Sequence, residues 1–301
     1  MDIVDTYGIP AANKIPNLSD KTRGILALEV TIEEKLDGSQ FSFMVEETTG
    51  KLHMRSKGRG LDWETLPEKD AFYRAVQGVL SVKDDLVPGF RYIGETLSKP
   101  RHNILTYDKT PANNIALFDI VSPGGTYLDS IAIVDIANLF NMSCCPVLFS
   151  GKLDNIEQLD ALLETESFLG GPKIEGVVIK ARQIKDKYGF PLMAKYVSQK
   201  FREKHGDRKK RKTVRGLSAV DDIGAALCTE ARWLKAVQHL RDNGRLTGTS
   251  KDIGPLMKEC SRDIESEEKE WIKDRLYEAF RKRILKIATS GLPQWYQSKV
   301  G

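Results

Sequence analysis

The sequence predicts an α+β fold, in which a mixed domain with antiparallel strands precedes a small all-helical domain. Three observations predict this order. Alternating apolar residues dominate the first two-thirds of the chain, a basic run follows, and apolar residues then recur at helical spacing to the end. The 301 residues are enough for two domains with separate cores. We place the boundary near residues 213–217, so that the domains span 1–213 and 217–301.

The first domain is expected to be rich in strands. Apolar and polar residues alternate across residues 25–56 around the turn Thr48-Thr49-Gly50, which predicts a three-stranded meander. Similar alternation predicts further strands at 90–95, 114–121, 174–181 and 192–198. Helical periodicity between these strands predicts helices at 68–82, 129–141 and 155–165.

The second domain is expected to be helical throughout. It follows a run from Lys200 to Arg215 that holds nine Lys or Arg residues. Ser218 is a suitable capping residue for a first helix, and Pro255 suits the first turn of a second. Periodic apolar residues over 272–287 predict a third helix.

Composition excludes several classes of protein. Hydrophobic residues make up 41% and charged residues 29% of the chain, which excludes a disordered chain, a collagen and a disulfide scaffold. The net charge of +4 permits a polyanionic partner without demanding one. The four cysteines lack metal-ligand spacing, and no apolar run has the length of a membrane span. We therefore expect a cytoplasmic protein with reduced thiols and no membrane partner.

The most informative stretch is Glu34-Lys35-Leu36-Asp37-Gly38, at the end of an expected strand. Lys35 has two interpretations. It is an exposed lysine paired with a neighbouring carboxylate, or it is a nucleophile whose amine must lose its proton before it attacks. A four-residue pattern recurs by chance and by itself favours the first interpretation. Five further motifs follow in order: Arg55-Ser56-Lys57-Gly58, Gly94-Glu95-Thr96, Ala116-Leu117-Phe118-Asp119-Ile120, Glu175-Gly176-Val177-Val178-Ile179-Lys180 and Met193-Ala194-Lys195-Tyr196-Val197.

This series resembles the nucleotidyltransferase motifs of covalent polynucleotide ligases and mRNA capping enzymes, over roughly residues 20–205. Within that superfamily it is most similar to nick-sealing, bacteriophage-type RNA ligases (RNA ligase 2-like), because of the stretch KYVSQKFREK and the helical tail. DNA ligases and capping enzymes instead carry a β-barrel domain after the catalytic domain. The resemblance implies a nucleotidyltransferase domain built from ATP-grasp-like antiparallel sheets.

The resemblance also implies a role for each matching residue. Lys35 would attack the α-phosphate of ATP and carry AMP covalently. Glu175 would help to hold a divalent metal, and Lys180 and Lys195 would contact the α-phosphate. These cations would lower the pKa of Lys35. The remaining implied contacts are Glu34 and Arg55 with AMP, Glu95 with the ribose hydroxyls, and Phe118 and Val178 with the two faces of the base.

Two features of the motifs need a structural explanation. Many relatives have two lysines in the closing motif, but here Met193 takes the first place and leaves only Lys195. In addition, strict alternation places Glu175 on the opposite face of its strand from Lys180. We therefore expect the strand to bulge or bend at Gly176.

The activity implied is that of an ATP-dependent RNA ligase, which seals 3′-hydroxyl and 5′-phosphate breaks, in duplex nicks, through lysyl-AMP and an AMP-capped 5′ end. ATP and Mg²⁺ or Mn²⁺ would be its cofactors, and RNA or an RNA-containing duplex would be its partner. The protein would act as a monomer in a bacterial or phage-infected cell. Two alternatives stay open: an ATP-dependent DNA ligase of the same superfamily, and a catalytically dead ligase-fold protein that binds nucleic acid. The helical tail is expected to bind a phosphate backbone through ionic contacts of Lys235, Arg241, Arg245, Lys251, Lys258 and Arg262.

Overall fold

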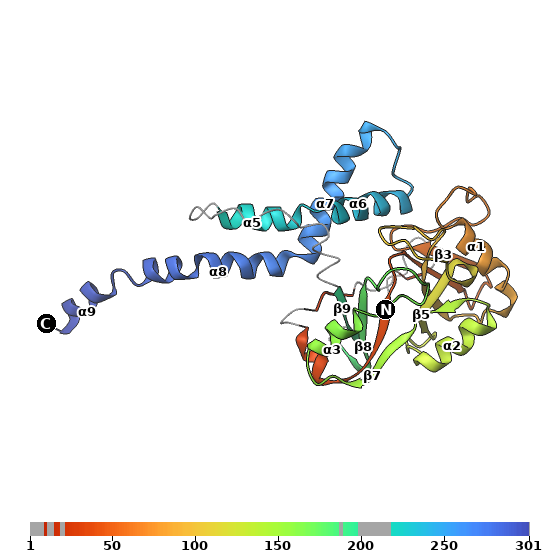
Figure 1. The fold of residues 1–301 in the computed structure, drawn as a ribbon, viewed down its shortest axis with the longest axis horizontal. Coiled ribbons are helices and arrows are strands. Elements are labelled where there is room, and N and C mark those ends of the chain that lie inside the picture. Colours follow the sequence, from red (N-terminus) through yellow and green to blue (C-terminus); the bar gives the residue numbers. More distant parts are fainter. Residues whose placement is uncertain (1–8, 11–14, 19–21, 187–188, 198–217, 301) are drawn as a thin grey trace.

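The computed structural model describes residues 9–10, 15–18, 22–186, 189–197 and 218–300. A sheet-rich body comes first, and helices then extend away from it toward the C-terminus (Figure 1). The basic run and the expected boundary at 213–217 lie outside the described residues.

Two sheets form the body. The first has four strands in the order β7-β1-β8-β9, and all of its neighbours are antiparallel. The second has five strands in the order β3-β2-β4-β5-β6, antiparallel except for the short β5–β6 pair. The strands are β1 (Glu29–Lys35), β2 (Ser39–Val45), β3 (Leu52–Ser56), β4 (Arg91–Thr96), β5 (Ile115–Val121), β6 (Ser143–Cys144), β7 (Val147–Lys152), β8 (Gly176–Lys185) and β9 (Pro191–Val197).

The expected meander over residues 25–56 is wrong in its pairing. β2 pairs with β3, but β1 pairs with β7 and β8 in the other sheet. The turn at residues 36–38 therefore carries the chain from one sheet to the other. Alternation in a sequence reports which residues share a face of a strand and does not report the neighbouring strand.

Short helices cover the two sheets. α1 (Tyr73–Leu80) and α2 (Ser130–Leu139) pack on the second sheet around buried aromatic residues, of which Phe43 and Tyr92 stack at 5.1 Å. α3 (Glu157–Leu162) packs on the first sheet through Leu159. The described part of the body also contains short 3-10 helices at Arg23–Ala27, Lys83–Asp85 and Ala112–Asn114.

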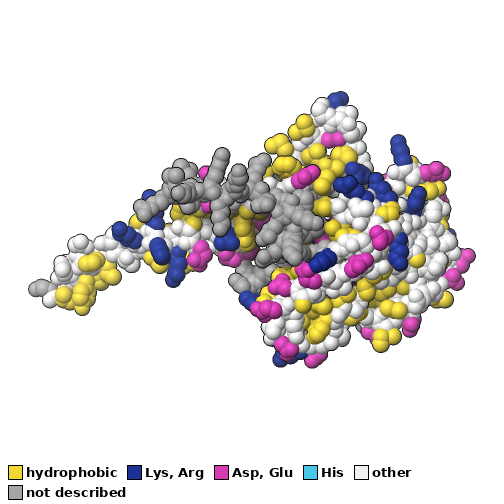
Figure 2. Space-filling model, viewed as in Figure 1, with side chains coloured by type: hydrophobic (Ala, Val, Ile, Leu, Met, Phe, Trp, Pro, Cys, Tyr) yellow, Lys and Arg dark blue, Asp and Glu magenta, His cyan; other side chains and the backbone are white. Residues whose placement is uncertain are grey.

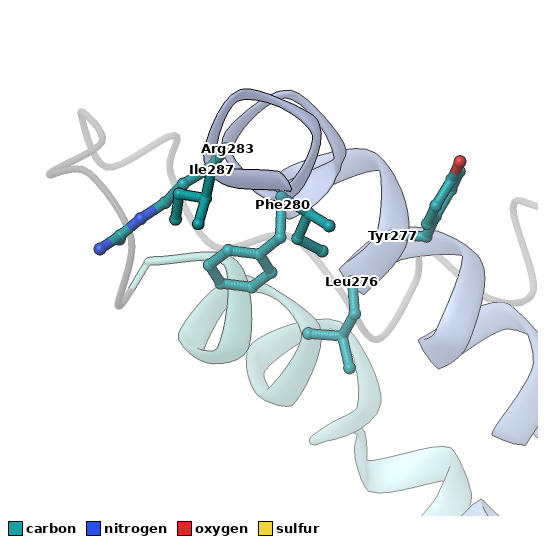
Figure 3. A pocket seen from close by; sticks show the side chains of 6 residues that line it. Leu276, Tyr277, Phe280, Arg283 and Ile287 are labelled. Carbon is teal, nitrogen blue, oxygen red and sulfur yellow. The ribbon is translucent and has the colours of Figure 1, made fainter. Parts of the chain in front are cut away.

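The tail is helical, as the periodicity predicts. It contains α5 (Ser218–Leu227), α6 (Glu230–Asp242), a 3-10 turn (Ser250–Asp252), α7 (Ile253–Glu267), α8 (Lys269–Ala288) and α9 (Leu292–Val300). The first expected helix is two helices, because Thr229 interrupts it and accepts a hydrogen bond from the Arg232 N–H as the N-cap of α6. In Figure 3, Leu276 and Phe280 of α8 point toward α5, whereas Tyr277 points away. None of the described helices is long and apolar enough to cross a membrane.

Candidate active site

A cavity of about 1400 Å³ is lined by residues of both sheets and of helices α6 and α7. Eight of the nine residues singled out from the sequence line it: Glu34, Lys35, Glu95, Phe118, Glu175, Val178, Lys180 and Lys195. The ninth, Arg55, does not. Its residue is 4% exposed, and its guanidinium donates to the backbone carbonyls of Ile9, Ser56 and Lys57. Arg55 thus supports the cavity wall from behind, while Lys57 and Arg59 of the same segment line the cavity.

The register of two strands brings Lys35 and Glu175 together. Lys35 lies opposite Gly176 in the β1–β8 ladder, and the Lys35 Nζ lies 2.5 Å from the Glu175 Oε2. Glu175 precedes β8, and the ladder is regular from Gly176 to Ala181. The expected bulge at Gly176 is therefore wrong. Glu175 lies just before the strand, so the alternation of side chains between the two faces of β8 does not apply to it. The glycine is required for another reason: a Cβ there would lie 2.5 Å from the Tyr196 carbonyl oxygen on β9.

Carboxylates keep Lys35 protonated. Burial lowers the pKa of its amine, but Glu175 and Glu95 outweigh burial and leave that pKa above its usual range. The expectation that Lys180, Lys195 and a metal lower this pKa concerns the site with its phosphate bound, and it stays a prediction. Burial in turn raises the pKa of both carboxyls, that of Glu95 to about 8, although Lys35 opposes the shift. In the protein alone these carboxylates therefore favour the protonated form of the Lys35 amine.

The turn after Lys35 is braced from the segment that follows β4. The Asp37 Oδ2 accepts hydrogen bonds from the N–H groups of Ile104 and Leu105 at 2.7 and 2.8 Å. Gly38 has no left-handed backbone, but a Cβ there would lie 2.7 Å from the Thr96 carbonyl oxygen. The aspartate and the glycine of this motif therefore position the lysine turn against the second sheet. Sequence reasoning assigned Asp37 no role.

Lys180 connects the two sheets. Its ammonium, on a residue 1% exposed, lies 2.7 Å from the Glu33 Oε2, 3.1 Å from the Asp119 Oδ1 and 2.7 Å from the Phe118 carbonyl oxygen. It also lies 5.2 Å from the centre of the Phe118 ring. Arg182 makes a second set of ion pairs with the same carboxylates. Lys180 is therefore buried and fully engaged, rather than solvated as strand lysines usually are.

Lys195 faces the same cavity from β9, and a residue of the helical tail holds it. Its Nζ lies 3.3 Å from the Glu267 Oε1 of α7. Burial lowers the pKa of Lys195 to about 8, Glu267 opposes this shift, and Lys235 adds to it. Met193 lies opposite Lys180 in the β8–β9 ladder and is not among the residues that line the cavity.

The end of α6 docks on the rim of the cavity. The Ser39 Oγ donates to the Asp242 Oδ2 at 2.8 Å and lies 3.0 Å from the His102 Nε2. The Arg59 Nε donates to the Asp242 carbonyl oxygen. Burial, followed by the charges of Arg241 and Lys99, lowers the pKa of His102 to about 4, so that the ring is neutral at pH 7. Sequence reasoning missed these contacts, because Ser39 and Asp242 are 203 positions apart.

The described residues contain no group of three or more His, Cys, Asp or Glu side chains arranged to hold a metal ion. Mg²⁺ commonly binds one or two carboxylates and completes its shell with phosphate oxygens and water. Glu175, which lines the cavity beside Lys35, fits such a partial site as its single carboxylate.

The fold resembles solved RNA ligase structures. An RNA ligase of Naegleria gruberi with PPi matches with a TM-score of 0.53 and 21% identity, over 67% of this chain and 59% of that one. A lysine-to-alanine variant of that ligase with ATP and Mn matches with a TM-score of 0.51 and 21% identity, over 67% and 60% of the two chains. The chain thus spans about three-fifths of the length of these structures.

Comparison with curated proteins gave no significant match. The sequence pattern of the RNA ligase family, however, matches residues 28–197, from the strand that carries Lys35 to the strand that carries Lys195. The match covers more than half of the chain and spans both sheets that line the cavity. The chain therefore belongs to the RNA ligase family.

Proposed function

We propose that this chain is an ATP-dependent RNA ligase that joins a 3′-hydroxyl to a 5′-phosphate at nicks in RNA-containing duplexes. The observation that carries the proposal is the position of Lys35, in a large cavity and against a single carboxylate that a divalent metal would compete for. Membership of the RNA ligase family supports it, as do the ATP, PPi and Mn held by the similar structures. We propose residues 1–213 as the adenylyltransferase domain and 217–301 as the helical domain.

In the first step the neutral amine of Lys35 attacks the α-phosphorus of ATP. A phosphorus–nitrogen bond forms, the bond to the β-phosphate oxygen breaks, pyrophosphate leaves, and the amine loses its proton. Such transfers depend on positioning and charge neutralisation more than on covalent help. A bound Mg²⁺ or Mn²⁺ would supply positive charge to the phosphates, and Glu175 would be its protein ligand.

Lys195 is the first choice for the α-phosphate contact. Its Nζ lies 3.3 Å from the Glu267 carboxylate, a long ion pair that a phosphate would readily replace. Lys180 would reach a phosphate only after its ammonium leaves Glu33 or Asp119. We therefore propose Lys180 as the second candidate for the α-phosphate contact.

The nucleoside would occupy the part of the cavity between the sheets. Phe118 of β5 and Val178 of β8 come from opposite sheets and both line the cavity, which suits them to cover the two faces of adenine. Glu95 would bind the ribose hydroxyls. Glu34 is held by the Ser167 hydroxyl at 2.5 Å, so we propose that it shapes the pocket beside the base.

The test is intact-mass measurement after incubation with ATP and Mg²⁺. The wild-type chain should gain one AMP, and Lys35→Ala should gain none. Lys35→Arg is the matched control, because it keeps the positive charge beside Glu175 and removes the nucleophile. Adenylation of either variant would refute the assignment, and a wild-type chain that never gains AMP would favour a catalytically dead ligase fold.

Sealing assays separate the RNA ligase from its DNA-sealing alternative. Two nicked duplexes should be compared that differ only in ribose or deoxyribose on the 3′-hydroxyl side of the nick, since the 2′-hydroxyl distinguishes the two strands. Preferential sealing of the ribose nick is the expected result. Equal or better sealing of the deoxyribose nick would point to the DNA ligase, and sealing of single strands alone would refute the nick-sealing, bacteriophage-type assignment.

A further inference from the structure

Most cations that line the cavity are neutralised by carboxylates of the protein. This is true near the candidate nucleophile and equally true along the helices that cover it. The pairs are Lys35 with Glu175, Arg59 with Asp70, Lys180 with Glu33 and Asp119, Lys195 with Glu267, Arg232 with Asp263 and Glu268, Lys235 with Asp263 and Glu267, and Arg262 with Glu259. Lys235 and Arg262 were expected from the sequence to bind a phosphate backbone. Both instead form ion pairs with carboxylates of α7.

Four lining cations differ, and we call them the basic rim: Lys99, Arg101, Arg241 and Arg245. All four are exposed, and within the described part of the chain none has a carboxylate partner. Arg241 donates to the Gln238 Oε1 at 3.4 Å, and its charge also acts on the carboxylate of Asp242 without a direct ion pair between them. The basic rim thus keeps positive charge that the protein itself does not use.

The basic rim is made from both parts of the molecule. Lys99 and Arg101 lie in the segment after β4, whereas Arg241 and Arg245 lie at the end of α6 and just beyond it. Lys99 and Arg241, one from each part, both lie near His102, since the charges of both act on its buried ring. In Figure 2, Lys and Arg side chains gather where the helices meet the sheet-rich body.

We propose that the basic rim binds the phosphate backbone of a nucleic-acid strand, so that one strand contacts both the sheet-rich body and α6. An exposed cation without a protein partner releases counterions when a phosphate takes its place, which favours a polyanion. Successive phosphates would also reach across the contact between Ser39 and Asp242, which would stabilise α6 on the cavity. This inference rests on the proposed function and names the surface on which the substrate strand lies.

The experiment measures binding rather than catalysis. A fluorescent nicked RNA duplex is titrated with the full chain at salt concentrations from about 50 to about 200 mM, and the binding constant is plotted against salt on logarithmic axes. The rim variant carries Lys99→Ala, Arg101→Ala, Arg241→Ala and Arg245→Ala. The control variant removes four exposed lysines that do not line the cavity, two in each part of the molecule: Lys109→Ala, Lys152→Ala, Lys282→Ala and Lys286→Ala.

Each phosphate contact contributes about 0.7 to 0.9 to the slope, so the rim variant should lose about 3 from it. The control variant should lose less than about 1. An unaltered slope in the rim variant, equal losses in the two variants, or a wild-type chain that does not bind the duplex would overturn the proposal.

Adenylation by ATP separates this proposal from the proposed function. The rim variant should gain AMP at the wild-type ATP concentration, because the basic rim does not hold the nucleotide. A rim variant that binds the duplex normally but needs more ATP would assign the basic rim to the triphosphate and overturn the inference. Failure of the wild-type chain to gain AMP, with the rim result as expected, would remove the proposed activity and leave the binding surface in place.

Discussion

Glu175→Gln tests how the protein controls its candidate nucleophile. The change keeps the size of the side chain and removes the negative charge 2.5 Å from the Lys35 Nζ. A unit charge at about 4 Å contributes about 4 kcal/mol at an effective dielectric constant near 20, and one pKa unit corresponds to about 1.4 kcal/mol. The Lys35 side chain is 27% exposed, which weakens the interaction. We therefore expect the pKa of Lys35 to fall by about two units.

Two readouts should move in opposite directions. Labelling of Lys35 by an amine-acylating reagent at pH 8, followed by peptide mass, reports the fraction of neutral amine. That fraction rises about tenfold for each unit by which the pKa falls, so labelling of the variant should be faster. Adenylation by ATP should be slower, because the proposed metal ligand is lost. Glu157→Gln, on the exposed first turn of α3, is the matched control and should change neither readout.

The opposite directions make the reasoning refutable. Labelling and adenylation that both slow down would mean that Glu175 positions the amine rather than keeping it protonated. Unchanged adenylation at low metal concentration would remove Glu175 from the metal site.

Three further changes follow from the same cavity. Gly176→Ala places a Cβ 2.5 Å from the Tyr196 carbonyl oxygen, so urea unfolding should show a loss of about 1 to 3 kcal/mol; an equally stable variant would contradict the close approach of β8 and β9. Burial raises the pKa of Glu95 to about 8. The protonated Glu95 carboxyl therefore contributes its full share of the folding stability below pH 4.5, and this share is lost as the pH rises through 8. Glu95→Gln should therefore exceed the wild type in stability at pH 9, by up to about 5 kcal/mol, and not at pH 4; the same difference at both pH values would contradict the shift. Glu267→Gln removes the charge that opposes burial at Lys195, so the pKa of Lys195 should fall below about 8 and the decline of adenylation at alkaline pH should begin at a lower pH; an unshifted profile would mean that the charge of Lys195 does not limit the reaction.

The positions of the site residues were largely predictable from the sequence. Motifs at strand ends predicted that Lys35, Glu95 and Glu175 would meet, and all three line one cavity. The membership of each strand in a sheet was not predictable, because β1 alternates as regularly as β2 and yet pairs in the other sheet. Alternation is a local property, whereas strand pairing depends on segments more than a hundred residues away.

The ion pairs of the site were beyond sequence reasoning for a similar reason. Lys180 was expected to face a phosphate, but Asp119 of the opposite sheet holds it. Lys195 was expected to contact a phosphate, and in the protein alone Glu267 of α7 reaches it. A motif identifies the residue type that a reaction requires. It does not identify the carboxylate that neutralises a buried lysine when the substrate is absent, although burial makes such a partner necessary.

Two of the contacts between the body and the helical tail differ in chemistry, and they should respond differently to a nucleotide. The contact of Lys195 with Glu267 is ionic and lies in the cavity, so a phosphate that binds Lys195 must displace this carboxylate. Glu267 then keeps Lys235 as a partner, at 3.0 Å, and is not left as an unpaired charge. The contact of Ser39 with Asp242 joins α6 to the rim through a hydroxyl donor, which a phosphate at Lys195 does not replace. Entry of a nucleotide should therefore loosen α7 while α6 stays docked. Glu267→Gln imitates that state in the protein alone, so hydrogen exchange should increase in α7 and stay unchanged in α6. Equal increases in both helices would mean that the tail leaves the body as one unit.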